Sequence, residues 1–344
     1  MLQRSSNSNA ASETQATLAI DIVICTYNRA AGVDTVLSAL SRQYPATDVA
    51  WSVVVIDNAS TDATAEIVDA HRSRRLLPGL RCVRESEQGL TPARRRGVLE
   101  TSAPWIAFVD DDNLLEPGWL DAIAHAIRSH PSAGAVGGRV VLEWERPPPR
   151  TFKNFGFCFA EQEPGGVACE LDSLVGAGMV VRRKALVECG WLAYPLLADR
   201  VGKRLVSGGD VEIAQRIRGA GYSLWFTPEA VLRHRIPRDR ISWRYLLRVN
   251  YGLGGSEAFV SALTWPGDWH SWRRAARWRS AKVVARTLRR ARGLAHAIAS
   301  LTFALGFARG VLDACIAMTP EERKALLGAA VCDGPGRLDS FRGE

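Results

Sequence analysis

Three consecutive aspartates, Asp110, Asp111 and Asp112, directly follow a short apolar run at residues 105–109. A buried strand that ends in this cluster places several negative charges at one sheet edge, where repulsion costs free energy unless a cation or donors offset it. Mg²⁺ and Mn²⁺ prefer oxygen ligands, and Mg²⁺ often binds one or two carboxylates together with substrate phosphates. The cluster therefore indicates a metal–diphosphate site. The alternative is an acidic turn that caps a helix beginning near Trp119.

Strand and helix signals alternate through the first two thirds of the chain. Short apolar, β-branched runs predict buried strands, and apolar residues at helical spacing predict helices between them. The predicted strands are residues 18–25, 51–56, 80–84 and 105–109. This repetition favours an α/β fold with a doubly wound, mostly parallel sheet, in which ligands bind at the carboxyl ends of the strands.

Polar clusters follow three of these strands at the same predicted edge. Residues 26–29 follow the first strand, residues 57–62 the second, and the three aspartates the fourth. An α/β scaffold needs turns there, but not turns so rich in carboxylate and arginine. Their convergence strengthens the metal–diphosphate interpretation.

The pattern changes after Pro131. It predicts a strand at 135–142, a long loop at 143–166, a strand at 174–181, a helix that begins at Asp210 and a short strand at 230–234. Beyond Ile236 the pattern is helical. We therefore expect a disordered lead at 1–17, one domain at 18–238, and a helical, basic region at 239–344.

Seven short motifs occur in an order that resembles the inverting family 2 glycosyltransferases of GT-A fold. They lie at residues 26–29, 57–62, 89–94, 108–113, 176–183, 207–212 and 228–234. The resemblance implies a Rossmann-like, mostly parallel nucleotide-binding sheet with flanking helices. It also implies transfer of a sugar from a nucleotide diphosphate sugar to a glycan or lipid-linked acceptor with inversion, in cell-surface polysaccharide or glycolipid synthesis.

The resemblance also implies roles for individual residues. The donor-binding residues would be Thr26, Tyr27, Arg29, Asp57, Arg94, Asp110 and Asp111, although the family often has Asn where this chain has Arg95. Asp112 and His234 would hold Mn²⁺ or Mg²⁺. Asp210 would be the catalytic base, and Gly178, Met179, Gly209 and Glu212 would lie on the acceptor side.

Elementary chemistry supports the two central roles. A nucleoside diphosphate leaves poorly unless a cation and arginine offset its developing charge, and the attacking hydroxyl must lose a proton to a base. Other readings of the same residues stay open. Asp210 fits a helix N-cap, His234 fits a packed histidine, and Glu212 either assists Asp210 or faces solvent.

The net charge of +8 is concentrated in the C-terminal third. Residues 269–312 contain ten basic residues, three tryptophans and no acidic residue. A weakly apolar stretch at 293–308 falls short of the roughly 20 residues that a spanning helix needs. We expect an interfacial segment on an anionic membrane surface, hence a cytoplasmic, peripheral protein of the inner membrane face. Nucleic-acid binding is the less favoured reading, and a solvated helical cap is the third.

The remaining features exclude some classes of protein. Seven cysteines occur singly without a CxxC pair, which argues against a disulfide framework or a zinc site. The N-terminus has no apolar run typical of a secretory signal. Two rival functions stay open. One is a sugar-1-phosphate nucleotidyltransferase, which usually has a glycine-rich loop after the first strand, although residues 26–29 of this chain do not form such a loop. The other is a non-catalytic nucleotide-sugar-binding protein.

Overall fold

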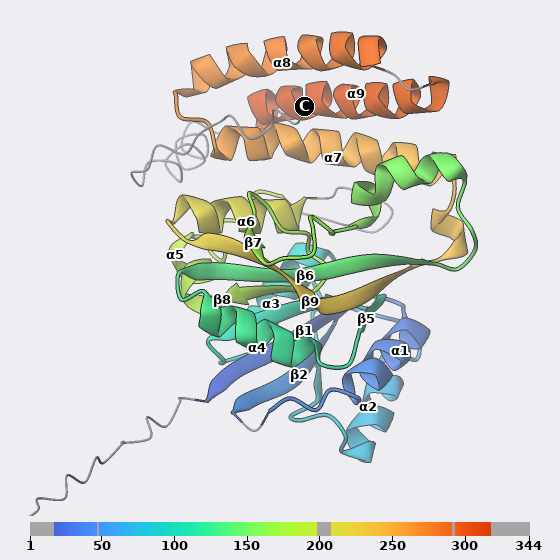
Figure 1. The fold of residues 1–344 in the computed structure, drawn as a ribbon, viewed down its shortest axis with the longest axis vertical. Helices are drawn as coiled ribbons and strands as arrows, with labels where there is room; N and C mark the ends of the chain where they lie inside the picture. Colours follow the sequence, from blue (N-terminus) through green and yellow to red (C-terminus); the bar gives the residue numbers. More distant parts are fainter. Residues whose placement is uncertain (1–16, 47, 198–207, 291–292, 318–344) are drawn as a thin grey trace, which may run out of the picture.

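The computed structural model describes residues 17–46, 48–197, 208–290 and 293–317. Within them, helices cover both faces of a nine-stranded sheet, and three long C-terminal helices stack above it (Figure 1). The predicted disordered lead at 1–17 lies, apart from Thr17, outside the described residues.

Four parallel strands form the half of the sheet that carries the polar turns. They are β1 (Leu18–Thr26), β2 (Val49–Asp57), β3 (Arg81–Arg84) and β4 (Trp105–Asp110), in the order β3-β2-β1-β4. All four were predicted, and their bounds differ by at most two residues. The register pairs Thr26 with Asp57 and Cys25 with Asp110, so the three polar turns begin at one edge.

The other half of the sheet is mixed. Strand β8 (Met179–Arg182) is antiparallel to β4 and to β6 (Ala133–Trp144), β9 (Ser223–Ile236) is parallel to β6, and β5 (Asn113–Leu115) is antiparallel to β9. The two-residue β7 (Cys169–Glu170) is antiparallel to β9. Together with the flanking and C-terminal helices, this mixed, mostly parallel sheet agrees with the predicted fold class.

Each face of the sheet buries its own apolar cluster. One face packs against α1 (Ala30–Leu40), α2 (Thr64–Arg74) and α4 (Trp119–Ser129), and the other against α3 (Leu90–Leu99), α5 (Arg183–Glu188) and α6 (Gly209–Gly219). Strands covered on both sides read as apolar-rich runs, which is why β1, β2 and β4 were predicted well.

Several predicted elements differ from those observed. The predicted loop at 143–166 contains the 3-10 helix η1 (Arg150–Phe159), and the predicted strand at 174–181 shortens to β8. Gly178 has φ +70°, and a Cβ there would lie 2.4 Å from Leu232 Cδ2, so the chain bends before β8. The aspartates do not cap a helix, because β5 intervenes and Gly118 is the N-cap of α4.

After the short helix η2 (Arg238–Arg240), three helices follow: α7 (Trp243–Leu263), α8 (Trp269–Arg290) and α9 (Leu294–Ala317). Helices α7 and α9 approach each other closely at glycines. A Cβ on Gly254 would lie 2.1 Å from Phe303 O, and one on Gly306 would lie 2.0 Å from Tyr251 O.

Helix α9 extends well past the predicted apolar stretch at 293–308. By length and composition, residues 294–316 suffice to cross a membrane, with a mean hydropathy of 1.4, and 39% of this apolar stretch is buried inside the protein. Two tryptophans expected at a membrane boundary, Trp269 and Trp272, are instead buried against α7 and α9, whereas Trp278 is 67% exposed.

Candidate active site

Two adjoining cavities open at the carboxyl edge of the parallel strands. The first, of about 290 Å³, lies at the end of β1, and we call it the β1 cavity. The second, of about 210 Å³, lies at the start of α6, and we call it the α6 cavity. Their linings share Leu90, Asp110, Asp112, Arg240 and Tyr245. The aspartate cluster therefore stands at the junction of two binding spaces.

Asp111 is held from the β1 side. Its Oδ2 accepts a hydrogen bond from the Thr26 hydroxyl at 2.7 Å, and its Oδ1 lies 3.4 Å from Arg29 Nε. Burial, together with the neighbouring Asp112 charge, raises the pKa of the Asp111 carboxyl to about 6, although Arg29 and the Thr26 hydroxyl oppose the rise. The carboxylates are thus crowded enough to favour a cation at this edge.

Asp112 joins the aspartate cluster to β9. Its Oδ2 accepts from Arg240 Nη1 at 2.9 Å and lies 3.6 Å from Arg29 Nη2. Its Oδ1 lies 3.4 Å from His234 Nε2. The His234 Nδ1 lies 2.7 Å from the carbonyl oxygen of Phe159, which can only accept, so Nδ1 is the donor. In the neutral ring, the Nε2 lone pair therefore faces a carboxylate oxygen.

This arrangement fits a divalent metal. A ligating histidine typically donates its other ring N–H to a carbonyl, as His234 does. No group of three or more His, Cys, Asp or Glu side chains suited to a metal occurs among the described residues. Asp112 and His234 would therefore supply two ligands, and substrate oxygens and water would complete the shell.

Two of the predicted donor residues, Asp57 and Arg94, are buried, and of these only Arg94 lines a cavity. The Asp57 carboxylate is buried, accepts from Ser60 N–H at 2.9 Å and lines neither cavity, whereas the adjacent Asn58 lines the β1 cavity. Arg94 is buried, lines the α6 cavity and lies 3.9 Å from Asp110 Oδ1. Tyr27 and Arg29 line the β1 cavity directly.

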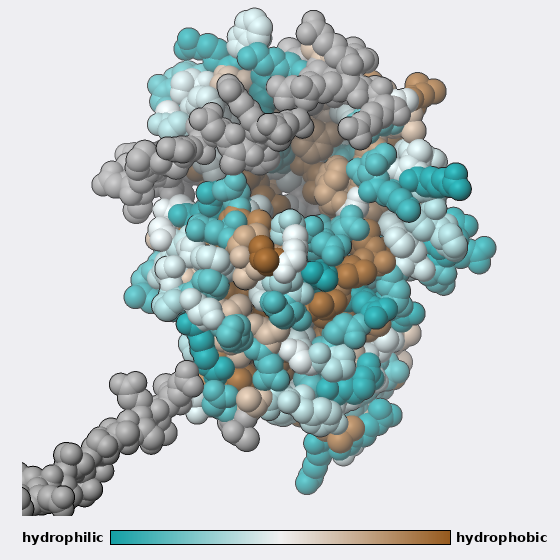
Figure 2. Space-filling view, in the orientation of Figure 1, coloured by the Kyte–Doolittle hydropathy of each residue, from teal (hydrophilic) through white to brown (hydrophobic). Residues whose placement is uncertain are grey.

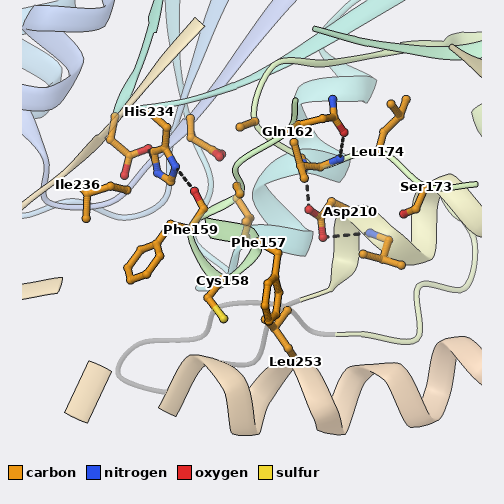
Figure 3. A pocket seen from close by; sticks show the side chains of 18 of the residues that line it. Phe157, Cys158, Phe159, Gln162, Ser173, Leu174, Asp210, His234, Ile236 and Leu253 are labelled. Atoms are coloured by element: carbon orange, nitrogen blue, oxygen red, sulfur yellow. Dashed lines mark hydrogen bonds and ion pairs between the residues drawn. The ribbon is translucent and has the colours of Figure 1, made fainter. Parts of the chain in front are cut away.

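Asp210 faces the α6 cavity from the first turn of α6. Its Oδ2 accepts from the Gly176 N–H at 2.7 Å and its Oδ1 from the Val211 N–H at 2.9 Å. Gly208 is the N-cap of this helix, so the capping alternative for Asp210 is wrong. His234 and Asp210 project toward the cavity from opposite sides (Figure 3).

The four residues predicted on the acceptor side line neither cavity. Met179 is fully buried in the core, Gly178 packs against Leu232, and Gly209 is buried at the start of α6. Glu212 is also fully buried and faces neither Asp210 nor solvent. Its carboxylate accepts from Leu196 N–H and Leu197 N–H, each at 2.9 Å, and from Arg216 Nε at 2.8 Å.

Comparison with known proteins identifies the family. The family model described as glycosyl transferase family 2 matches residues 21–190, which contain the aspartate cluster. The chain belongs to glycosyl transferase family 2. It is therefore a glycosyltransferase, and the two rival functions do not describe it.

Relatives of this glycosyltransferase include two proteins of Haloferax volcanii. It is 29% identical over 227 residues to glycosyltransferase AglE, covering 62% of this chain and 66% of the relative. It is 22% identical over 251 residues to a glucosyl-dolichyl phosphate glucuronosyltransferase, covering 71% and 78%. A mannosyltransferase of Pyrobaculum calidifontis, solved with GDP-Man and Mn²⁺, has 20% identity and a TM-score of 0.50, covering 91% of this chain and 86% of that one. This likeness shows a common fold.

Several residues of the glycosyltransferase site received no individual role from the sequence, among them Arg240, Phe157, Gln162 and Gly176. Arg240 lies beyond the last family-like motif, and Phe157 and Gln162 lie in the segment predicted as a loop. Gly176 belongs to the motif at residues 176–183, but the resemblance assigned no role to this glycine. A Cβ on it would lie 2.9 Å from Asp210 Cβ and 3.1 Å from Arg94 Nη2. Gln162 donates to Gly138 O at 2.9 Å and accepts from Val175 N–H at 3.1 Å. It thus ties the segment before Gly176 to β6.

Proposed function

We propose that this glycosyltransferase moves a sugar from a nucleotide diphosphate sugar to a hydroxyl of a glycan or lipid-linked acceptor, with inversion. The observation that carries the proposal is the position of Asp112 and Asp210 on the lining of one cavity, with Asp112 also lining the β1 cavity. One carboxylate is in place for a metal–diphosphate leaving group and the other for an attacking hydroxyl. The product would enter polysaccharide or glycolipid synthesis.

The donor would lie in the β1 cavity. Tyr27 and Asn58 line it, and Arg29 and Arg240 lie beside the carboxylates, where they would bind the diphosphate. Asp112 and His234 would hold Mn²⁺ or Mg²⁺. When bound, the ion offsets the charge that develops on the leaving diphosphate.

The acceptor would occupy the α6 cavity. Asp210 would take the proton from the acceptor hydroxyl as that oxygen bonds to the anomeric carbon and the bond to the diphosphate breaks. The Gly176 N–H holds one carboxylate oxygen and thereby fixes the orientation of the base. A single base acting on the face opposite the leaving group supports direct displacement, which inverts the anomeric centre.

Membrane attachment is part of the proposal. Helix α8 presents an arginine-rich surface formed by His270, Arg273, Arg274, Arg277 and Trp278. Cations of this kind are attracted to anionic lipids. We place the enzyme in the cytoplasm, peripherally on the inner face of the cell membrane.

The test is a panel of nucleotide sugars incubated with the purified full chain, with release of nucleoside diphosphate as the readout. At least one donor should be turned over with Mn²⁺ or Mg²⁺, and a chelator should stop the release. Asp210→Asn should reduce turnover by about 10²–10⁴-fold, the usual contribution of general acid–base catalysis. Turnover that persists in the chelator would contradict the metal site, and full activity of Asp210→Asn would contradict the base.

A further inference from the structure

A second large concavity lies outside the site described so far. It is a mostly apolar groove of about 600 Å³ between α7 and α9, which we call the α7–α9 groove. Its walls include Leu197, Leu247, Gly255, Phe259, Thr302 and Gly306. Apart from this groove, Figure 2 shows hydrophobic surface between the C-terminal helices and the sheet. Glycines on both helices contribute to the lining of the groove without side chains, although Gly306 and Gly310 themselves pack against the α7 backbone.

The outer face of α9 beside this groove is also apolar. Leu294, Ile298, Leu301, Leu305, Leu312 and Ile316 are all exposed, with Leu305 at 56% and Ile316 at 81%. They recur every three, four or seven residues and therefore share one helix face. The groove residues Thr302 and Gly306 lie on the neighbouring face. An exposed apolar surface of this kind marks an interaction site, and here it continues into the groove.

The groove borders the segment that carries the proposed catalytic base. Gly208, the N-cap of α6, packs so closely on α7 that a Cβ there would lie 2.7 Å from Ser256 Cβ, and Ser256 lines the groove. Asp210 is two residues further along the same turn and lines the α6 cavity. One short segment thus separates the apolar groove from the acceptor cavity.

Two cations lie in the lining of the groove. Arg248 and Arg309 are both exposed, and Arg309 pairs with Asp313 at 2.9 Å. Asp313 also lines the groove, so its carboxylate partly offsets this charge. An apolar channel bordered by arginines is complementary to an amphiphile with a hydrocarbon chain and an anionic head group.

We propose that the α7–α9 groove binds the hydrocarbon chain of a lipid-linked glycan acceptor, and that the phosphate joining this chain to the glycan contacts Arg248 and Arg309. This inference rests on the proposed function in one respect, namely that the acceptor is lipid-linked. The apolar face of α9 contacts the membrane, the chain enters the groove from there, and a hydroxyl of the glycan meets the sugar donor beside Asp210.

The experiment measures binding of three probes to the full chain by calorimetry, without any donor: decyl phosphate, hexyl phosphate and decanol, each below its aggregation concentration. Each buried methylene is worth about 4-fold in affinity. Decyl phosphate should therefore bind up to about 200-fold more tightly than hexyl phosphate. Equal affinities for the two phosphates would overturn the proposal.

Variants locate the binding. A Cβ on Gly255 would meet only Gly306 O, at an ordinary 3.6 Å, so Gly255→Leu should fill the groove and remove the preference for the longer chain. Thr302→Trp should do the same from α9, which keeps the test valid if one variant folds poorly. Gly166→Leu is the matched control, because a Cβ there meets no atom within 4 Å. An unchanged preference in both groove variants would refute the assignment.

A third set of variants tests the head group. Arg248→Ala and Arg309→Ala should each weaken the binding of decyl phosphate by about tenfold or more. The affinity for decanol should not change, because only the phosphate accepts a charge-assisted hydrogen bond. Equal losses for both probes would contradict the phosphate contact. The probes are measured without a donor, so this experiment and the turnover assay can fail independently. If the groove does not bind the probes, the enzyme can still turn over its donor. If the proposed function is wrong, no donor is turned over, but the probes can still bind.

Discussion

Replacing Gly176 with alanine tests the positioning of the catalytic base. The new Cβ would lie 2.9 Å from Asp210 Cβ and 3.1 Å from both Asp210 Oδ2 and Arg94 Nη2. These distances are too short, so Asp210 or the segment carrying Gly176 must move. Movement lengthens the 2.7 Å bond from Gly176 N to Asp210 Oδ2. A hydrogen bond to a charged group is worth about 1.5–3 kcal/mol, so turnover should fall about 10- to 150-fold.

The assay compares turnover with donor affinity. Nucleoside diphosphate release gives kcat, and calorimetric titration with UDP or GDP and Mn²⁺ gives donor-side binding, which should change little because the β1 cavity lacks Gly176. Gly166→Ala is the control, since a Cβ there has open space. If Gly176→Ala keeps normal turnover, close packing on Asp210 does not position the base.

Three further predictions concern other parts of the molecule. Glu212→Ala should lower the free energy of unfolding by about 3–5 kcal/mol in denaturant titrations, because Arg216 would stay buried without its carboxylate; a loss below about 1 kcal/mol would argue against this clamp. His234→Ala should reduce the Mn²⁺ dependence of nucleoside diphosphate binding at least about tenfold, and unchanged dependence would make His234 a packing residue only. The full chain should co-sediment with anionic vesicles, each correctly placed cation contributing about 1 kcal/mol, and should release them as salt rises. Equal binding to neutral vesicles would show that the apolar face of α9, and not the arginine-rich surface of α8, attaches the protein.

The parallel half of the fold could be predicted because the local sequence of its strands reflects their burial. Strands β1, β2 and β4 are largely buried on both faces, so they appear as apolar-rich runs. The polar turns follow from them, since parallel strands end at one edge. The convergence of Thr26, Arg29 and Asp111 in the structure follows from that topology.

The acceptor side could not be predicted because tertiary contacts decide it. Glu212 lies one helical position from a cavity residue, yet a buried arginine and two backbone N–H groups bind its carboxylate. Met179 belongs to a strand whose antiparallel pairing with β4 no local pattern reveals. Arg240 reaches Asp112 across 128 residues of sequence, and a single arginine in a basic region gives no signal for such a contact.

The C-terminal helices show the same limit. Their helicity follows from the sequence, but the direction of each tryptophan depends on how the helices pack. Trp272 contributes to the interface of α8 with α7 and α9, while Trp278, six residues later, is exposed. From composition alone, both Trp272 and Trp278 were predicted to lie at a membrane surface.

The most direct test of the central claim is a calorimetric titration of UDP and GDP, with and without Mn²⁺, into the wild type, Asp112→Asn and Asp210→Asn. The wild type should bind one nucleoside diphosphate in a metal-dependent manner. Asp112→Asn should lose that dependence, because one carboxylate joins the metal to the protein, whereas Asp210→Asn should bind like the wild type although it no longer transfers sugar. Unchanged metal-dependent binding in Asp112→Asn would contradict the account.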